Sequence, residues 1–196
     1  MNLKFKINSD ISKAETLPSS FYKNPELFEL IKENVFLKTW HWIGDENLIK
    51  ETNSLHPFVL LEGYLDEPLL LSKVSNSNIR CLSNVCTHRG NLLILEDCKS
   101  SKIRCMYHGR RFKNDGEFEF MPDFEETKNF PRKCDNLQNF SIKNWNKLLF
   151  VGLNPIVDIE EVINTMNNRI GFLPLDKSKF DPSLSQDFKI NAHWAL

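Results

Sequence analysis

The stretch Asn84–Arg111, NVCTHRGNLLILEDCKSSKIRCMYHGRR, contains two short segments that each hold one cysteine and one histidine. One residue separates Cys86 from His88, and two residues separate Cys105 from His108. The whole chain has five cysteines and five histidines among 196 residues, so this concentration is unusual. Thiolates and imidazoles are strong ligands of transition metals. The sequence therefore predicts a metal centre held by these four side chains.

Two types of metal centre use two cysteines and two histidines. Zinc sites of this composition usually place the cysteines together, as C-x₂₋₄-C, and the histidines together, as H-x₃₋₅-H. Here each segment mixes the two residue types. A Rieske [2Fe–2S] cluster explains the mixture, because two histidines replace two cysteines on one of its irons. We therefore expect Cys86 and Cys105 on one iron and His88 and His108 on the other, with zinc as the alternative.

The same stretch resembles the cluster-binding segment of the Rieske non-haem iron oxygenases, which include ring-hydroxylating dioxygenase alpha subunits and choline- and carnitine-type monooxygenases. The resemblance covers roughly residues 20–196 and includes these further segments: Phe21–Glu26 (FYKNPE), Thr39–Gly44 (TWHWIG), Gly116, Phe130-Pro131 and Leu149–Leu153 (LFVGL). One position departs from the family. The second segment usually reads C-x-Y-H-G-W, and here Arg110 stands in place of the tryptophan.

The resemblance implies the N-terminal Rieske part of a terminal oxygenase that hydroxylates or demethylates a small aromatic or quaternary ammonium substrate. It also implies that electrons arrive from a ferredoxin or a flavoprotein reductase. They would pass to a mononuclear iron in a neighbouring subunit of a homotrimer. The alternative is a stand-alone Rieske-type ferredoxin that acts as an electron carrier. A carrier needs only about a hundred residues around the cluster, so the additional segments on either side favour the oxygenase.

Respiratory Rieske proteins carry an additional cysteine in each ligand loop and join the two by a disulfide. By resemblance, the corresponding positions here are Asn91 and Tyr107 (or Met106), which cannot form that bond. Without the disulfide, we expect a reduction potential toward the low end of the Rieske range, which is about −150 to +300 mV. A low potential suits a cluster that delivers electrons for oxygen activation.

The overall pattern predicts a mainly β fold, an antiparallel β-sandwich with an N-terminal helical arm and a C-terminal helix. The resemblance implies that the sandwich is a Rieske domain and that the helix leads into a truncated α+β catalytic domain. Residues 1–39 form the arm, in which Asn24 caps a helix that begins at Pro25. Residues 40–155 form the Rieske domain, because short β-type runs separated by turn signals favour a sandwich. These runs are Phe58–Leu61, Leu69–Val74, Ile79–Asn84, Ile103–Cys105, Arg111–Lys113, Glu117–Phe120, Phe140–Ile142 and Leu148–Leu153.

Residues 156–196 are expected to hold a linker helix and the first strand of the truncated catalytic domain. Asp158 and Glu161 predict a capping box for a helix near 159–168. This helix is expected to end before Gly171.

The last residues, 186–196, alternate in polarity as a strand would. In the resembling family, this stretch opens the domain that holds a mononuclear iron on two histidines and one carboxylate. Only His193 lies beyond the cluster segment, so such a set cannot be assembled from these 196 residues. We therefore expect no catalytic residue here, and interpret the chain as the N-terminal part of a longer subunit.

The composition is typical of a cytoplasmic globular protein. Charged residues make up 26% and hydrophobic residues 41% of the chain, which is ordinary. A net charge of −1 gives no reason to expect nucleic acid or membrane binding. No apolar run approaches the about 18–20 residues of a membrane span, and the start has no signal-peptide core. Cys81, Cys98 and Cys134 are expected to be reduced thiols that serve as small buried hydrophobes.

Several other residues near the ligand segments have less specific roles. Gly90 and Gly109 follow the ligand histidines and are expected to form tight turns that let backbone N–H groups reach the cluster sulfurs. Arg89, Arg110 and Arg111 are either solvated charges or a cationic rim that attracts an acidic ferredoxin or reductase. The three remaining histidines are not expected to bind metal. His41 is expected at an interface or in the core, His56 in a turn facing solvent, and His193 at the surface or in packing.

Overall fold

The computed structural model describes residues 5–196, and residues 1–4 of the predicted arm lie outside this range. Its α-helices are α1 (Ser19–Lys23), α2 (Pro25–Asn34) and α3 (Ile159–Ile170). Its strands are β1 (Trp40–Asp45), β2 (Ser54–Leu60), β3 (Glu67–Ser75), β4 (Asn78–Ser83), β5 (Cys98–Lys99), β6 (Lys102–Arg104), β7 (Arg111–Lys113), β8 (Phe118–Phe120), β9 (Asn139–Trp145) and β10 (Leu148–Gly152). Within residues 5–196, no helix is both long and apolar enough to cross a membrane.

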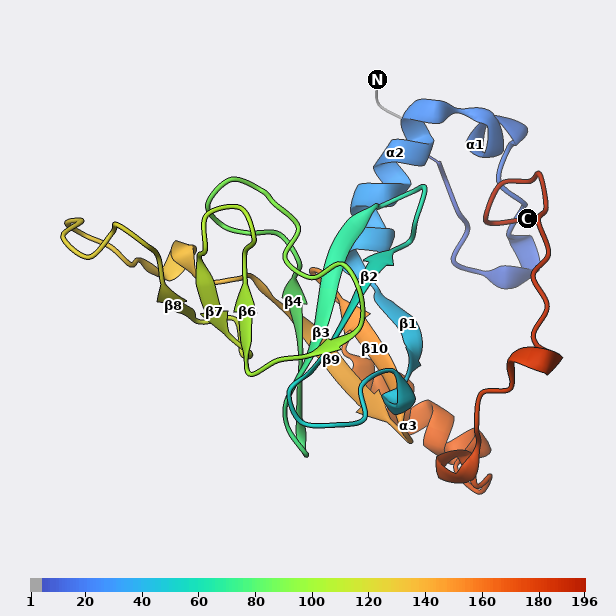
Figure 1. The fold of residues 1–196 in the computed structure, drawn as a ribbon. Helices are drawn as coiled ribbons and strands as arrows, with labels where there is room; N and C mark the ends of the chain where they lie inside the picture. Colours follow the sequence, from blue (N-terminus) through green and yellow to red (C-terminus); the bar gives the residue numbers. More distant parts are fainter. Residues whose placement is uncertain (1–4) are drawn as a thin grey trace.

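The strands form two antiparallel sheets. The larger sheet has the order β1-β10-β9-β4-β3-β2-β5, and the smaller has the order β6-β7-β8. Strand β9 joins the two halves of the larger sheet, because its first residues pair with β4 and its later ones with β10. The smaller sheet lies on one side of the larger, and α2 and α3 lie on the other (Figure 1). The predicted antiparallel β fold with flanking helices is confirmed.

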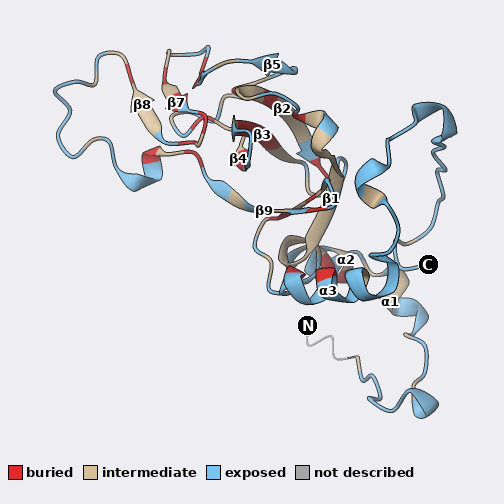
Figure 2. Ribbon diagram, turned by 90° about the horizontal axis from the view of Figure 1, so that it is seen from below, coloured by how far each residue is buried: buried red, intermediate tan, exposed pale blue. Residues whose placement is uncertain are grey.

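Strand β3 separates two parts of the hydrophobic core. Side chains on a strand alternate between the two faces of the sheet. Accordingly, Leu70 packs in a cluster between the two sheets, whereas Leu69 and Leu71 pack in a second cluster on the opposite face. All three leucines are fully buried, and buried residues concentrate along these central strands (Figure 2). The first cluster also contains Cys86 and Cys105, so the two predicted thiol ligands are part of the hydrophobic core.

The two longer helices begin where the sequence predicts. The side chain of Asn24 accepts hydrogen bonds from the amides of Glu26 and Leu27, with Pro25 at the first helical position. At the other end of the chain, α3 ends immediately before Gly171, as predicted.

The cap of α3 differs in detail from the prediction. Asp158 accepts a hydrogen bond from the amide of Glu160 at 2.9 Å, rather than from that of Glu161 as a capping box requires. The helix packs on the larger sheet through Trp145, whose indole N–H donates to the side chain of Asn167 at 2.7 Å. Trp145 precedes the tight turn at Asn146 and Lys147 between β9 and β10.

The prediction of a strand over residues 186–196 is wrong. This segment follows an irregular path (Figure 1). Phe188 and Ile190 in it are exposed. Polarity that alternates along a chain forms a strand only where a partner strand supplies hydrogen bonds. Instead, His193 and Trp194 pack against aromatic side chains of the N-terminal helical arm, including Phe28.

Candidate metal centre

The predicted ligands lie on two loops that share one hydrogen-bond pattern. The first loop joins β4 to β5 and contains Cys86, and the second joins β6 to β7 and contains Cys105. In each loop, the cysteine amide donates to the carbonyl five residues later at 2.8 Å. The amide four residues later, that of Gly90 or Gly109, donates to the cysteine carbonyl at 3.0 Å. The two loops therefore present their ligands in equivalent turns, although their cysteine-to-histidine spacings differ.

Two glycines make these turns possible. Gly90 has a φ of +70° and Gly109 a φ of +78°, in the left-handed region that side chains with a Cβ adopt at a cost. A Cβ at Gly109 would also lie 3.3 Å from Cγ of Pro122, whereas a Cβ at Gly90 would meet open space. The predicted tight turns are thus confirmed at both positions.

The four predicted ligand side chains come together as one thiol pair and one imidazole pair. The rings of His88 and His108 lie with their centroids 4.9 Å apart, at an angle of 72°. Cys86 and Cys105 are buried, with exposed fractions of 3% and 2%. Cys105 lies close enough to Cys86 to affect the pKa of the Cys86 thiol.

The surroundings set the protonation states of these groups. Burial raises the pKa of the Cys86 thiol, the amide of His88 offsets part of this rise, and the neighbouring Cys105 adds to it. Burial lowers the pKa of His88, and the adjacent His108 lowers it further. Neutral imidazole is the form that binds a metal, whereas the two thiols must lose their protons to a cation. The site therefore suits a metal centre that binds with release of thiol protons.

One atom of the site supports this assignment directly. Nδ1 of His108 is buried and has no hydrogen-bond partner among the described residues. A buried polar atom is normally satisfied, and a bound ion is one of the explanations of an unpaired one. Among residues 5–196, no three Cys, His, Asp or Glu side chains converge closely enough to hold a single metal ion. One thiol pair and one imidazole pair match a binuclear centre with two ligands on each iron.

The predicted cationic rim is wrong at one of its three positions. Arg110 is only 3% exposed, and its guanidinium pairs with the carboxylate of Asp135 at 2.7 Å. Arg111 is half-buried and lies 4.4 Å from the ring centroid of Phe120, while Arg89 is exposed. Sequence reasoning also missed Asp135. A charged residue at a position that is usually tryptophan signals that a buried acid must lie nearby, because buried charges need partners.

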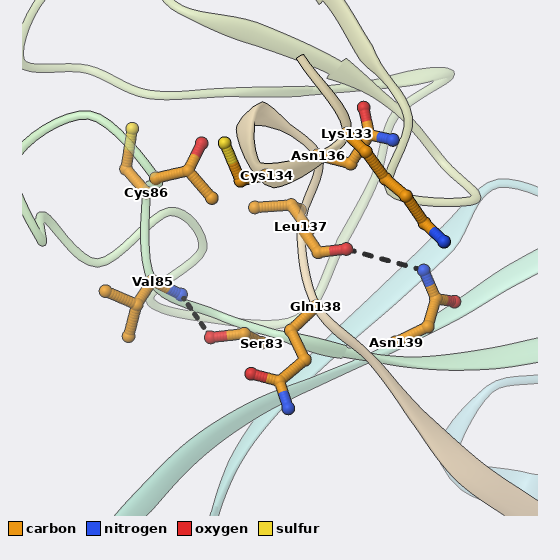
Figure 3. A pocket seen from close by; sticks show the side chains of 10 residues that line it. Ser83, Val85, Cys86, Lys133, Cys134, Asn136, Leu137, Gln138 and Asn139 are labelled. Carbon is orange, nitrogen blue, oxygen red and sulfur yellow. Dashed lines mark hydrogen bonds between the residues drawn. The ribbon is translucent and has the colours of Figure 1, made fainter.

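The other cysteines divide by environment. Cys81 is fully buried, as predicted, but Cys98 and Cys134 are exposed, so the prediction that they are buried is wrong. Cys134 lines a cavity of about 610 Å³ beside the first ligand loop. Figure 3 shows this cavity between Cys86 on that loop and the segment from Lys133 to Asn139.

The remaining histidines have structural contacts. Nε2 of His41 lies 2.7 Å from the carbonyl oxygen of Phe36, and Nδ1 of His56 lies 2.6 Å from a carboxylate oxygen of Asp97. The ring of His193 packs among aromatic rings of the N-terminal arm. The contacts of His41 and His193 agree with the prediction. The prediction that His56 is a solvent-facing turn residue is wrong, because it lies within β2 with a side chain only 20% exposed.

Comparison with known families identifies the domain that carries the site. The family profile of the Rieske [2Fe-2S] domain matches residues 40–131, which contain both ligand loops. The carnitine monooxygenase oxygenase subunit of Escherichia coli K12 is 29% identical over 144 residues, which cover 73% of this chain and 37% of that subunit. The chloroplastic choline monooxygenase of Beta vulgaris is 26% identical over 187 residues, which cover 93% of this chain and 41% of that enzyme.

Solved structures give the same fold. A quaternary ammonium Rieske monooxygenase superposes with a TM-score of 0.69 at 22% identity, over 82% of this chain and 48% of that one. Naphthalene 1,2-dioxygenase from Rhodococcus superposes with a TM-score of 0.62 at 26% identity, over 73% of this chain and 32% of that one. This chain therefore spans less than half the length of each of these four proteins.

Proposed function

Because the chain carries a Rieske [2Fe–2S] domain and matches the N-terminal part of Rieske oxygenase subunits, we propose that it is the electron-relay part of a terminal oxygenase. In this proposal, Cys86 and Cys105 hold one iron and His88 and His108 hold the other. When bound, the [2Fe–2S] cluster supplies a one-electron redox centre. The observation that carries the proposal is the pairing of two buried thiols with two adjacent imidazoles, one of which has an unsatisfied buried nitrogen.

The residues of the two loops would prepare the site for this role. Burial of the thiol pair removes water from the side of the centre that faces the core. On the outer side, Met106 and Tyr107 are 80% and 59% exposed, so the tip of the second loop reaches the surface next to His108. Electron transfer between proteins requires close approach of the redox centres, and an exposed ligand loop permits it.

The partners and the substrate are further parts of the proposal. We propose that electrons come from a ferredoxin or a flavoprotein reductase and pass to a mononuclear iron held by two histidines and one carboxylate. The names of the carnitine and choline monooxygenases favour a quaternary ammonium substrate, with an aromatic one as the alternative. A homotrimer in the cytoplasm is the proposed assembly, and free thiols suit that reducing compartment.

The relay is tested by separating electron uptake from oxygenation. The anaerobically purified 196-residue chain is mixed with NADH and a reductase–ferredoxin pair, and bleaching of its visible absorption is followed. Oxygen is then admitted with L-carnitine, choline or naphthalene, and products are measured by mass spectrometry. We expect reduction without product, because only His193 follows the cluster segment, so the two histidines and one carboxylate of the proposed mononuclear iron site cannot be assembled from these 196 residues. Oxygen uptake that depends on substrate and yields product would contradict the proposal that this chain relays electrons without oxygenating a substrate. Failure of the iron-loaded chain to accept electrons would also contradict it.

A further inference from the structure

A buried ion pair lies behind the second ligand loop. Arg110 follows His108 by two residues, and its Nη2 donates to Oδ1 of Asp135 at 2.7 Å. The guanidinium group also lies 5.0 Å from the ring centroid of Phe118 and 5.5 Å from that of Phe130. The side chains of Arg110 and Asp135 are 4% and 10% exposed, so water screens this pair only weakly.

The same aspartate also contacts the first ligand loop. The backbone carbonyl of Asp135 accepts a hydrogen bond from the hydroxyl of Thr87 at 2.8 Å. Thr87 stands between Cys86 and His88. A chain of two hydrogen bonds, Thr87–Asp135–Arg110, therefore connects one ligand loop to the other through a residue that belongs to neither.

The Asp135 carboxylate, at the centre of this hydrogen-bond chain, accepts a further hydrogen bond. Its second oxygen, Oδ2, accepts the amide of Arg132 at 2.8 Å. Burial raises the pKa of Asp135, but the hydrogen bonds from the Arg132 amide and from Arg110 outweigh it, so the pKa lies below its ordinary value. Asp135 is therefore a carboxylate at neutral pH. It pairs with the buried Arg110 guanidinium and, at 3.5 Å, with the largely exposed guanidinium of Arg132, which water screens more strongly.

We propose that the Thr87–Asp135–Arg110 chain is a clasp that positions the two ligand loops and balances the charge beside the [2Fe–2S] centre. This inference rests on the proposed function. By resemblance, the positions that a disulfide joins in respiratory Rieske proteins correspond to Asn91 and Tyr107 (or Met106), so the clasp links the loops without a covalent bond. Arg110, Asp135 and Thr87 act as positioning residues.

The two halves of the ion pair make opposite electrostatic predictions. Replacing Arg110 leaves a buried negative charge, which disfavours the addition of an electron and lowers the midpoint potential. Replacing Asp135 leaves a buried positive charge, which favours the added electron and raises the midpoint potential. A residue that merely supports the fold would not shift the potential in a direction that follows the sign of the charge removed.

The experiment compares Arg110→Gln, Asp135→Asn, the double variant, Thr87→Val and the control Arg111→Gln in the iron-loaded full chain at pH 8. Protein-film voltammetry gives the midpoint potential, and loss of visible absorption in the presence of an iron chelator gives the rate of iron release. Arg111→Gln removes an equal charge from a half-exposed side chain of the next residue, so it should change neither quantity appreciably.

We expect the midpoint to fall in Arg110→Gln, rise in Asp135→Asn and return toward the parent value in the double variant. Iron release should be about tenfold faster in each single ion-pair variant, because breaking a buried pair strongly destabilises its surroundings. Thr87→Val should release iron faster with an unchanged midpoint, because it removes one hydrogen bond and no charge.

Shifts of equal sign in Arg110→Gln and Asp135→Asn would overturn the electrostatic part of the proposal. If Arg110→Gln does not load iron, the clasp is judged on Asp135→Asn and Thr87→Val, and parental release rates in both would overturn it. A parent chain that binds no iron would instead contradict the proposed function, so the two failures are distinguishable.

Discussion

Burial and neighbouring charge give the five cysteines different chemistry. Cys81 points into the core from β4, and burial raises the pKa of its thiol to about 12. Cys86 and Cys105 are buried next to each other, where a cation would convert them to thiolates. Cys98 and Cys134 are exposed. The five cysteines thus divide into one fully buried thiol, the two proposed metal ligands and two exposed thiols.

The reactivity of the thiols can be predicted from this division. Iodoacetamide at pH 8 should modify Cys134 and Cys98 in the folded chain and leave Cys81 unmodified, because only a thiolate reacts. Cys98 should react slowly, because partial burial and the neighbouring Asp97 and Glu96 raise the pKa of its thiol. Peptide mass spectrometry after timed quenching measures each site. Unfolding in guanidinium should make Cys81 react as well. Modification of Cys81 in the folded chain at the rate of Cys134 would contradict the structure.

The ligand set makes a second prediction at the residue scale. Replacing Cys86, Cys105, His88 or His108 by Ala should each abolish the cluster or make it unstable, because each iron would lose one of its two protein ligands. Iron and acid-labile sulfide analysis of each purified variant measures the loss.

The remaining cysteines provide the matched controls for these variants. Cys81→Ser, Cys98→Ser and Cys134→Ser should each retain the iron and sulfide content of the parent chain. Loss of the cluster in Cys134→Ser, whose residue lies in the cavity beside the first ligand loop, would show that the ligand set is wrong.

At the scale of elements, the two ligand turns depend on their glycines to different degrees. Gly90→Ala and Gly109→Ala should each destabilise the chain by about 1–2 kcal/mol, because both residues are left-handed. Gly109→Ala should cost more, since its Cβ would lie 3.3 Å from Pro122. Urea unfolding of both variants measures the difference. Asn variants, which tolerate this conformation better, should recover part of the loss. Equal stability of all variants and the parent would contradict the account.

Most of the strands are predictable from sequence because the apolar residues that each strand buries lie within the strand itself. The pattern predicts a strand over 69–74, and β3 spans Glu67–Ser75. Strand β1 is not predicted, because Trp40–Asp45 is interrupted by Gly44 and none of its residues is fully buried. Strand β5 has only two residues, both exposed, which is too short for a periodic pattern.

The ligand set is also predictable, whereas its supporting contacts are not. Cys86 and His88 can be recognised as candidate ligands from their residue types and their spacing within one loop. The pair Arg110–Asp135 joins residues 25 positions apart, and neither one alone reveals whether it is buried. Long-range pairs of this kind depend on how the loops fold back onto each other. For that reason, the sequence suggests an exposed Arg110 and the structure buries it.

At the scale of the whole molecule, the two ends of the described chain meet on the side away from the ligand loops (Figure 1). His193 packs against Phe21 and Tyr22 of α1, and Trp194 packs against Phe36. The helical arm and the C-terminal segment therefore form a second centre of contacts, separate from the metal centre. This arrangement leaves the tip of the ligand loops free for a redox partner.

The redox behaviour of the molecule follows from its ligands. Reduction adds negative charge to the centre, so electron uptake and proton uptake by the centre become linked. The midpoint should therefore be constant at low pH and fall as pH rises through the pKa values of the oxidised form. It should also lie toward the low end of the Rieske range of about −150 to +300 mV. Protein-film voltammetry between pH 6 and pH 10, roughly the range in which such groups titrate, measures both. A pH-independent midpoint near the top of the range would contradict this.

The central claim is that two thiols and two imidazoles of this chain hold a [2Fe–2S] cluster. Electron paramagnetic resonance of the anaerobically purified, dithionite-reduced chain tests it most directly, together with iron, sulfide and zinc analysis of the same sample. The account predicts a brown protein with about two irons and two sulfides per chain and a reduced-state signal with a low average g value. A colourless protein with stoichiometric zinc and no such signal would contradict it.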